Sequence, residues 1–243
     1  MSEPMSLLRS ALFSTPLIAL CTIFMGTLSL IASFFDKTGK SQHALARIWA
    51  RMLLAVSFIR VRVVGLEKLD PNGAYVFVVN HGSFMDIPAL LASLPHQFRF
   101  FAKKGLFSIP FLGTHLTRAG HLPVDRSSPR ASLKTMLEAA KIIKQRGISV
   151  LNFPEGGRSH AHEGLREFKE GPAYIAIKAG VPVVPVGIVG MRDLLPMGSG
   201  HLRSGDVVVR VGEPIPTAGM EASQRMELTL RLHGEVSQLM NTR

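Results

Sequence analysis

The segment Asn80–Asp86 (NHGSFMD) places a histidine and an aspartate close together, directly after a Val-rich run. Imidazole is the side chain best suited to accept a proton near neutral pH. A carboxylate beside it would fix its tautomer and stabilise the imidazolium ion. His81 is therefore a candidate general base, and Asp86 is its candidate orienting partner. Two structural alternatives remain for these residues: a hydrogen-bonded turn at His81, and a helix capping box formed by Ser83 and Asp86.

No evident protein nucleophile accompanies this pair. The sequence has no Gly-x-Ser-x-Gly turn, and its one cysteine, Cys21, lies in an apolar segment. A base without such a nucleophile would activate a hydroxyl group on the substrate. The pattern therefore indicates group transfer.

Two other segments carry side chains suited to phosphate. Arg126 follows an extended segment, and Arg158 follows two glycines that let the backbone approach a ligand closely. An arginine can hold a phosphate through two parallel hydrogen bonds. Glu155 could orient an arginine or bind an acceptor hydroxyl. The structural alternatives are solvated surface charges for the arginines and a plain salt bridge for Glu155.

Short Val- and Ile-rich runs separated by helical stretches surround these motifs. We expect strands at 61–64, 75–79, 148–153, 183–187 and 207–211, and helices at 86–94, 132–146, 171–179 and 220–240. The run 181–186 is expected to be mostly strand with edge prolines. This alternation predicts an α/β fold, a layered and mostly parallel sheet flanked by helices. In such folds, sites lie at the carboxyl ends of the strands.

The first part of the chain is strongly apolar. Residues 10–35 carry no charge, and a helix over 17–35 would be about 28 Å long, close to the thickness of a bilayer core. A cleaved signal peptide is the alternative, but the apolar run is longer than usual and no A-x-A site follows it. The amphipathic stretch 44–59 would lie in the membrane interface or pack as a core helix. We expect 1–59 to be membrane-anchoring helices and 60–243 to be the globular domain.

Composition restricts the partners. With 47% hydrophobic residues the chain is not intrinsically disordered, and one cysteine excludes a disulfide framework or a cysteine-based zinc site. The net charge of +11 favours an anionic membrane surface or a phosphorylated substrate. One tryptophan and two tyrosines supply little stacking surface, so nucleic acid is not an expected partner. His160, His162 and Glu163 are too few and too loosely placed to predict a metal site.

Four blocks of this sequence, in this order, resemble the 1-acyl-sn-glycerol-3-phosphate acyltransferase family of glycerolipid acyltransferases. They are N-H-x-x-x-x-D at 80–86, P-V-D-R at 123–126, F-P-E-G-x-R-S at 153–159 and V-P-V-V-P-V at 181–186. The similarity covers about residues 61–216, including A-K-K at 102–104 and F-K-x-G at 168–171. The family usually has threonine where this chain has Gly157, a difference that bears on the handling of the acceptor.

The resemblance implies roles for these residues. His81 would be the general base and Asp86 its orienting partner. The residues implied to hold the acceptor phosphate are Arg126, Glu155, Gly156 and Arg158, with Lys103 assisting. The implied reaction moves a fatty acyl group to the sn-2 hydroxyl of lysophosphatidic acid and forms phosphatidic acid. The donor would be acyl-CoA or acyl carrier protein, and neither a cofactor nor a metal is expected.

Other acceptors and one other class of protein fit the same sequence. The acceptor could be another lysophospholipid, glycerol-3-phosphate or a lyso-aminolipid. A non-enzymatic protein that binds anionic lipid is the third possibility, although it would need neither His81 nor Asp86. Segment 98–112 would either dip into lipid headgroups or form a core strand and helix. Short length, absence of disulfides and cytosolic donors favour a bacterial inner membrane, with the globular domain on the cytoplasmic side.

Overall fold

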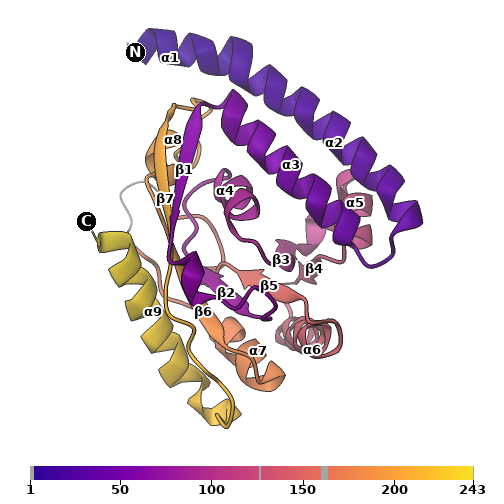
Figure 1. Ribbon diagram of the computed structural model, residues 1–243, viewed down its shortest axis with the longest axis vertical. Helices are drawn as coiled ribbons and strands as arrows, with labels where there is room; N and C mark the ends of the chain where they lie inside the picture. Colours follow the sequence, from indigo (N-terminus) through magenta and orange to yellow (C-terminus); the bar gives the residue numbers. More distant parts are fainter. Residues whose placement is uncertain (1–2, 126, 160–163, 243) are drawn as a thin grey trace.

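The computed structural model describes residues 3–125, 127–159 and 164–242, and its centre is a single β-sheet (Figure 1). In this part of the chain seven strands follow the order β1-β7-β6-β2-β5-β3-β4. All neighbouring pairs are parallel except β6 and β7. The strands are β1 (Ile59–Val64), β2 (Val76–Val79), β3 (Phe98–Lys103), β4 (Leu122–Val124), β5 (Ser149–Asn152), β6 (Val183–Val189) and β7 (Gly205–Val211). The predicted α/β fold with a mostly parallel sheet is confirmed.

Helices cover both faces of the sheet because its central strands are apolar on both sides. In β2, Phe77 and Val79 point to one face, and Val76 and Val78 point to the other. The first face is covered by α3 (Lys40–Val56) and α4 (Asp86–Ser93), and the second by α6 (Pro129–Arg146), α7 (Gly171–Ala179) and α9 (Arg225–Asn241). The short helices are η2 (Leu66–Lys68), η3 (Lys104–Ser108), α5 (Leu112–Arg118), α8 (Met191–Leu194) and η4 (Ala222–Gln224).

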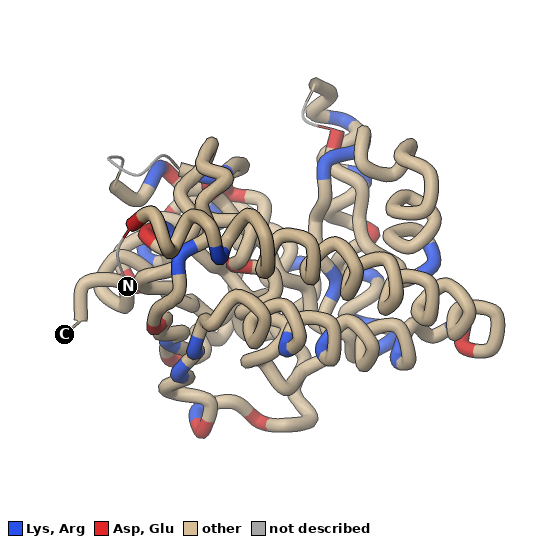
Figure 2. The backbone as a smooth tube through the Cα atoms, turned by 90° about the horizontal axis from the view of Figure 1, so that it is seen from above, with Lys and Arg blue, Asp and Glu red and all other residues tan. Residues whose placement is uncertain are grey.

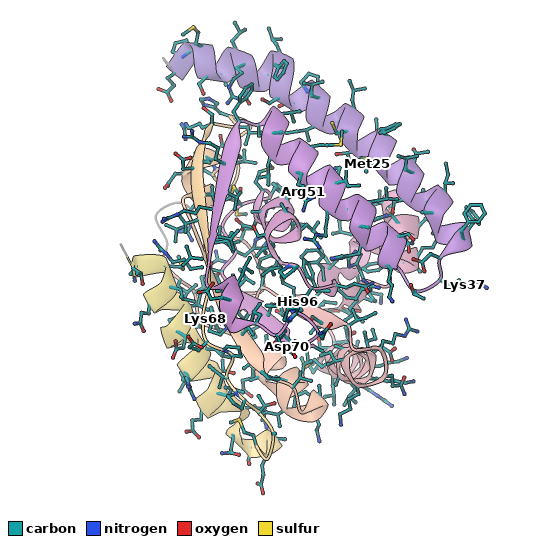
Figure 3. The ribbon with its side chains drawn as sticks, viewed as in Figure 1. Met25, Lys37, Arg51, Lys68, Asp70 and His96 are labelled. Carbon is teal, nitrogen blue, oxygen red and sulfur yellow. The ribbon has the colours of Figure 1, made fainter. Side chains whose placement is uncertain are left out.

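The N-terminal helices lie along the outside of the molecule. Helix α1 (Glu3–Arg9), the π-helical turn η1 (Ser10–Ser14) and α2 (Thr15–Phe35) form one continuous rod (Figure 1). Figure 2 shows that α2 carries no charged residue along its length. By length and composition, Glu3–Phe35 is the one helix in the described ranges able to cross a membrane. Met25 points from α2 toward α3, whereas Lys37 projects outward at the turn between them (Figure 3).

Helix α3 begins earlier than expected because the polar residues before it cap it. The Asp36 carboxylate accepts the backbone N–H groups of Thr38 and Ser41, each at 2.7 Å. These bonds hold the pKa of Asp36 well below its usual range. On the inner side of α3, Ala50 and Leu53 join the hydrophobic core. The contacts of α3 therefore favour the core-helix interpretation of this segment.

Strand β3 follows one of the two interpretations given for its segment, a core strand, whereas β6 differs from the sequence-based expectation. The segment 98–112 begins as β3, whose Phe98 is completely buried. Strand β6 lies inside the sheet, between β7 and β2, so the prolines are not at an edge. The pairing of β6 with β7 begins at Val186, one residue after Pro185. Pro185 is tolerated because its missing N–H removes no hydrogen bond between these two strands.

Candidate active site

The site begins where β2 ends, and Asn80 anchors the chain at that point. Its side-chain Nδ2 donates to the Ile188 carbonyl at 3.0 Å, and the Ile188 N–H donates to its Oδ1 at 2.7 Å. Both bonds connect the end of β2 to the neighbouring strand β6. His81 therefore leaves the sheet from a fixed position at the carboxyl end of a central strand, as the sequence predicted.

His81 and Asp86 are in direct contact. The distance between His81 Nδ1 and Asp86 Oδ2 is 2.8 Å. Because a carboxylate can only accept, Nδ1 carries the proton and the lone pair lies on Nε2. The imidazole stacks on Phe153, with ring centroids 4.0 Å apart. The ring is thus held in one orientation, and its Nε2 is suited to accept a proton.

Asp86 contacts both the imidazole of His81 and the turn that begins α4. The oxygen that meets the imidazole also accepts the backbone N–H groups of Gly82 and Ser83, each at 2.8 Å. Ser83 Oγ in turn accepts the N–H of Met85 at 3.3 Å. Three donors therefore compensate the burial of a carboxylate that is only 1% exposed. One side chain both begins α4 and orients the imidazole.

The segment 153–159 holds the backbone of His81 from the side of β5. The His81 N–H donates to Glu155 Oε1 at 2.7 Å, and the Ser159 N–H donates to the His81 carbonyl at 2.9 Å. The other oxygen of Glu155 accepts the N–H of Arg166 at 3.2 Å. Burial raises the pKa of Glu155, and these two bonds oppose that rise. Glu155 lies behind His81 and fixes its main chain.

A large cavity lies in front of His81. It has a volume of about 1050 Å³. Of the other residues predicted for the site, Lys103, Gly156 and Arg158 line it, while Arg126 lies outside the described residues. The Arg158 guanidinium lies 3.3 Å from the centre of the Phe84 ring, and burial lowers its pKa. The structure thus brings an imidazole and two cationic side chains to one cavity.

Lys169, Arg166 and Arg192 are among the basic residues near this cavity that sequence reasoning missed. Lys169 and Arg166 also line it, and a Cβ added to Gly156 would lie 3.0 Å from Lys169 Nζ. Arg192, which follows β6, donates to Ser159 Oγ. Lys169 stands in the F-K-x-G block, so its presence could have been found from the sequence. No motif marks Arg192.

The remaining cavity wall is largely apolar and comes from helices on the N-terminal side. It includes Met25 of α2, Trp49 of α3, Leu91 of α4 and Phe111 and Leu116 near or in α5. Ligand pockets commonly combine an apolar lining with a few placed polar groups. This cavity therefore suits a ligand that joins an anionic group to a long apolar chain.

Metal ligands do not gather here among the residues that the structure describes. Within those ranges no three His, Cys, Asp or Glu side chains are placed to hold a metal ion. The segment with His160, His162 and Glu163 lies outside them. The described chemistry of the site is that of an oriented imidazole and of cationic side chains.

Comparison with known proteins gives a consistent result. The family model described as Acyltransferase matches residues 60–189. The chloroplastic 1-acyl-sn-glycerol-3-phosphate acyltransferase BAT2 of Brassica napus is 39% identical over 178 residues, which are 72% of this chain and 51% of that protein. The human 1-acyl-sn-glycerol-3-phosphate acyltransferase alpha is 32% identical, over 72% of this chain and 62% of its own length. This chain thus spans about half to two thirds of the length of such curated relatives.

A solved structure resembles almost the whole chain. The 1-acyl-sn-glycerophosphate acyltransferase PlsC from Thermotoga maritima matches with a TM-score of 0.80 and 28% identity. The match covers 98% of this chain and 95% of that one. The N-terminal helices are therefore included in the similarity, together with the sheet and its flanking helices.

Proposed function

This chain belongs to the acyltransferase family, and from that membership and the His81–Asp86 contact we propose that it acylates the sn-2 hydroxyl of lysophosphatidic acid. The donor is an acyl thioester, of coenzyme A or of acyl carrier protein, and the product is phosphatidic acid. The observation that carries the proposal is the position of His81: Nδ1 is committed to Asp86, and the ring lines the cavity.

The proposed reaction proceeds through one oriented base. Nε2 of His81 takes the proton of the sn-2 hydroxyl while that oxygen attacks the thioester carbonyl carbon. The tetrahedral intermediate collapses, the carbon–sulfur bond breaks, and the thiolate receives the proton from the imidazolium ion. Asp86 stabilises the imidazolium between the two proton transfers. No covalent bond to the protein is formed.

The cationic residues of the cavity would hold the acceptor phosphate. Arg158 supplies a planar guanidinium, and Lys103 and Lys169 supply ammonium groups to the same cavity. Arg126 is proposed for the same task from its sequence block. We assign Glu155 to positioning, because both of its carboxylate oxygens accept backbone N–H groups. Gly156 leaves space for the Lys169 ammonium group, because a Cβ at this position would lie 3.0 Å from Lys169 Nζ.

Residues 1–59 are proposed to attach the protein to a membrane, with 60–243 as the acyltransferase domain. The support is the apolar rod of α1 and α2, whose large side chains are exposed: Leu20, Ile23, Phe24, Ile31 and Phe34 are each more than half exposed. The net charge of +11 favours contact with anionic lipids. The proposed location is a bacterial inner membrane, with the domain on the cytoplasmic side, where acyl thioesters are made.

Acyl transfer by the purified protein tests the function. We expect the wild type to convert lysophosphatidic acid and an acyl-CoA into phosphatidic acid. His81→Ala should lower kcat by roughly 10²-fold to 10⁴-fold, because the base is lost. His201→Ala is the matched control, since His201 bonds Ser6 and does not line the cavity.

The acceptor and donor are decided in the same assay. Lysophosphatidylcholine, a lyso-aminolipid and glycerol-3-phosphate compete as acceptors, and acyl carrier protein replaces coenzyme A as the carrier. Full activity in His81→Ala would overturn the mechanism. Absence of transfer with every donor and acceptor would favour the third possibility, a protein that binds anionic lipid without catalysis.

A further inference from the structure

A second group of polar side chains lines the active-site cavity, apart from the residues used above. We call it the inner polar cluster, and it comes from the N-terminal helices and from the β3 side of the sheet. Its members are Ser29 of α2, Gln42 and His43 of α3, Arg99 of β3, His115 of α5 and His121 before β4. Gln42 is 1% exposed and Arg99 is 3% exposed. Polar groups buried in an apolar cavity call for a partner.

Gln42 lacks that partner. Neither its Nε2 nor its Oε1 makes a hydrogen bond to any residue that the structure describes. The same is true of Nε2 of the neighbouring His43. Gln42, which lines the cavity, thus has a buried amide whose N–H donors and carbonyl acceptor are all unpaired, and His43 has an unpaired ring nitrogen.

Two of the three cluster histidines, His43 and His121, are neutral, and their tautomers can be assigned. Burial, together with Arg99 and Arg47, lowers the pKa of His43 to about 4. The ring of His43 bonds the backbone of His96, so its unpaired Nε2 is an acceptor. Burial and Arg99 lower the pKa of His121 to about 3. The Phe100 N–H donates to His121 Nδ1 at 3.1 Å, which leaves the proton on Nε2 as a donor.

Arg99 is fixed beside these groups. Its Nη2 donates to the carbonyl of Thr38 at 2.9 Å, and its Nη1 donates to the carbonyl of Phe98 at 3.4 Å. The cluster therefore combines donors on Arg99, Gln42 and His121 with acceptors on Gln42 and His43. Because the cluster offers both kinds of group, its matching ligand must be able both to donate and to accept a hydrogen bond.

We propose that the inner polar cluster binds a hydroxyl group carried on the acyl chain of a lipid substrate. A hydroxyl can donate to His43 or to the Gln42 carbonyl while it accepts from the Gln42 amide or from His121. A carboxylate has no proton to donate and would leave the acceptors unpaired. A plain methylene chain would leave the whole Gln42 amide unpaired.

The chain, and not the headgroup, is the part of a lipid that would carry this hydroxyl. His81, Arg158 and Lys169 already provide for the reacting oxygen and the phosphate in the same cavity. Apolar side chains, Met25 and Trp49 among them, supply much of the remaining wall. This inference rests on the proposed function for the identity of the lipid. It extends that function to a class of hydroxylated acyl chains.

Competition between matched acyl chains tests the inference. Acyl-CoA pairs of equal length are compared, one plain and one hydroxylated near the carboxyl end, at mid-chain or at the terminal carbon. A second arm keeps the donor plain and places the hydroxyl on the chain of lysophosphatidic acid. At one of these hydroxyl positions, on either the donor chain or the acceptor chain, we expect kcat/KM to be about ten-fold higher than for the plain chain of equal length.

Gln42→Leu should bring this ratio close to one, because leucine fills the site without hydrogen-bonding groups. Gln145→Leu is the matched control: Gln145 is exposed on α6, and the ratio should not change. If Gln42→Leu does not fold, Gln42→Met serves in its place. A ratio near one at every position in the wild type overturns the inference, and so does a ratio that survives in both Gln42 variants.

Trp49 provides a readout that needs no turnover. It is the one tryptophan of the chain and lines the same cavity, so its fluorescence should report binding of each lipid alone. We expect a dissociation constant about ten-fold lower for the hydroxylated lipid than for the plain one. Selective binding without acyl transfer would uphold the inference and overturn the proposed function. Transfer without selectivity would overturn the inference alone.

Discussion

One oxygen of Asp86 meets both an imidazole and two backbone N–H groups, and substitution can separate these tasks. Asp86→Asn keeps an oxygen for the start of α4 but cannot hold the imidazole as a carboxylate does. We expect kcat to fall by roughly 10³-fold to 10⁴-fold, by analogy with the aspartate of a serine-protease triad. The thermal midpoint should change little. Steady-state kinetics and thermal unfolding measure the two effects.

Asp86→Ala is the comparison for this variant. It removes the oxygen from the buried N–H groups of Gly82 and Ser83, so it should lower the free energy of unfolding by about 1–3 kcal/mol as well. Equal kcat values for the wild type and Asp86→Asn would contradict the orienting role. Equal losses of stability in both variants would contradict the division of tasks.

Gly157 has room for the side chain that the family usually carries there. A Cβ at this position would meet only Arg166 Nη1, at 3.9 Å, an ordinary van der Waals contact. Gly157→Thr should therefore fold normally and change KM for the acceptor more than kcat, because Gly157 lines the cavity. Kinetics with lysophosphatidic acid and glycerol-3-phosphate measure this. Gly180→Thr is a useful contrast, since its φ of +68° disfavours any side chain.

At the level of residues, the sequence predicted the local contact between His81 and Asp86 but not the contacts between distant segments. His81 and Asp86 are separated by one turn, and their contact follows from local geometry. Glu155 bonds His81 across 74 positions, and its approach to a backbone N–H, not to a ligand, depends on how β2 and β5 pair. Arg192 reaches Ser159 from a third segment in the same way. Such contacts are set by tertiary packing, which spacing in the sequence does not reveal.

At the level of elements, α2 presents an apolar face to the surroundings of the protein. Ile23 and Phe24 are 62% and 59% exposed. If this face inserts into lipid, each side chain contributes about 2 kcal/mol to membrane binding. The double variant Ile23→Ser, Phe24→Ser should then lower partition into vesicles by about 10³-fold. Sedimentation with vesicles of anionic lipid measures the partition coefficient.

The matched control lies at the other end of the chain. Met226 and Leu230 of α9 are similarly exposed, at 61% and 69%, and sit one turn apart. Their double replacement by serine should leave vesicle partition unchanged. If the α2 variant also partitions as the wild type does, the proposed attachment through α2 is wrong.

The sequence predicted the helices and strands well, but not the burial of each element or its neighbours in the sheet. Val- and Ile-rich runs located β1, β2, β5, β6 and β7 within a few residues. The sequence of the segment that becomes β3 allows two interpretations, because its mixture of Phe, Arg and Lys suits a core strand and a segment in the lipid headgroups equally. The prolines of segment 181–186 suggest an edge strand, but strand order is a property of the whole sheet. One strand's composition cannot specify its neighbours.

At the level of the whole molecule, acid should weaken the fold through His43 and His121. Their pKa values are lowered to about 4 and about 3, from 6.5 in the unfolded chain, mainly by burial. Below pH 6.5 the unfolded chain therefore binds more protons than the folded one. The stabilising contribution is complete above that pH and falls with decreasing pH, by up to roughly 1.4 kcal/mol per pH unit for each histidine.

Chemical unfolding in detergent, from neutral pH to about pH 4, measures this dependence. His121→Asn should reduce the dependence of the unfolding free energy on pH by the equivalent of about one proton. Asparagine can accept the Phe100 N–H but does not titrate. Gln145→Asn, at an exposed position of α6 that carries no titratable group, should keep the wild-type slope. A wild-type slope in the His121 variant would show that His121 does not differ between the folded and unfolded states.

The pairing of β1 with β7 has a consequence for synthesis of the protein. Strand β1 follows the N-terminal helices directly, but its partner in the sheet lies about 140 residues later. At ~5–20 residues per second, a ribosome would need roughly 7–30 s to supply that partner. During this interval the nascent chain displays an apolar rod and an unpaired strand edge. If the apolar rod of α1, η1 and α2 inserts into a bilayer as it is synthesised, its apolar side chains are not free to aggregate before β7 is made.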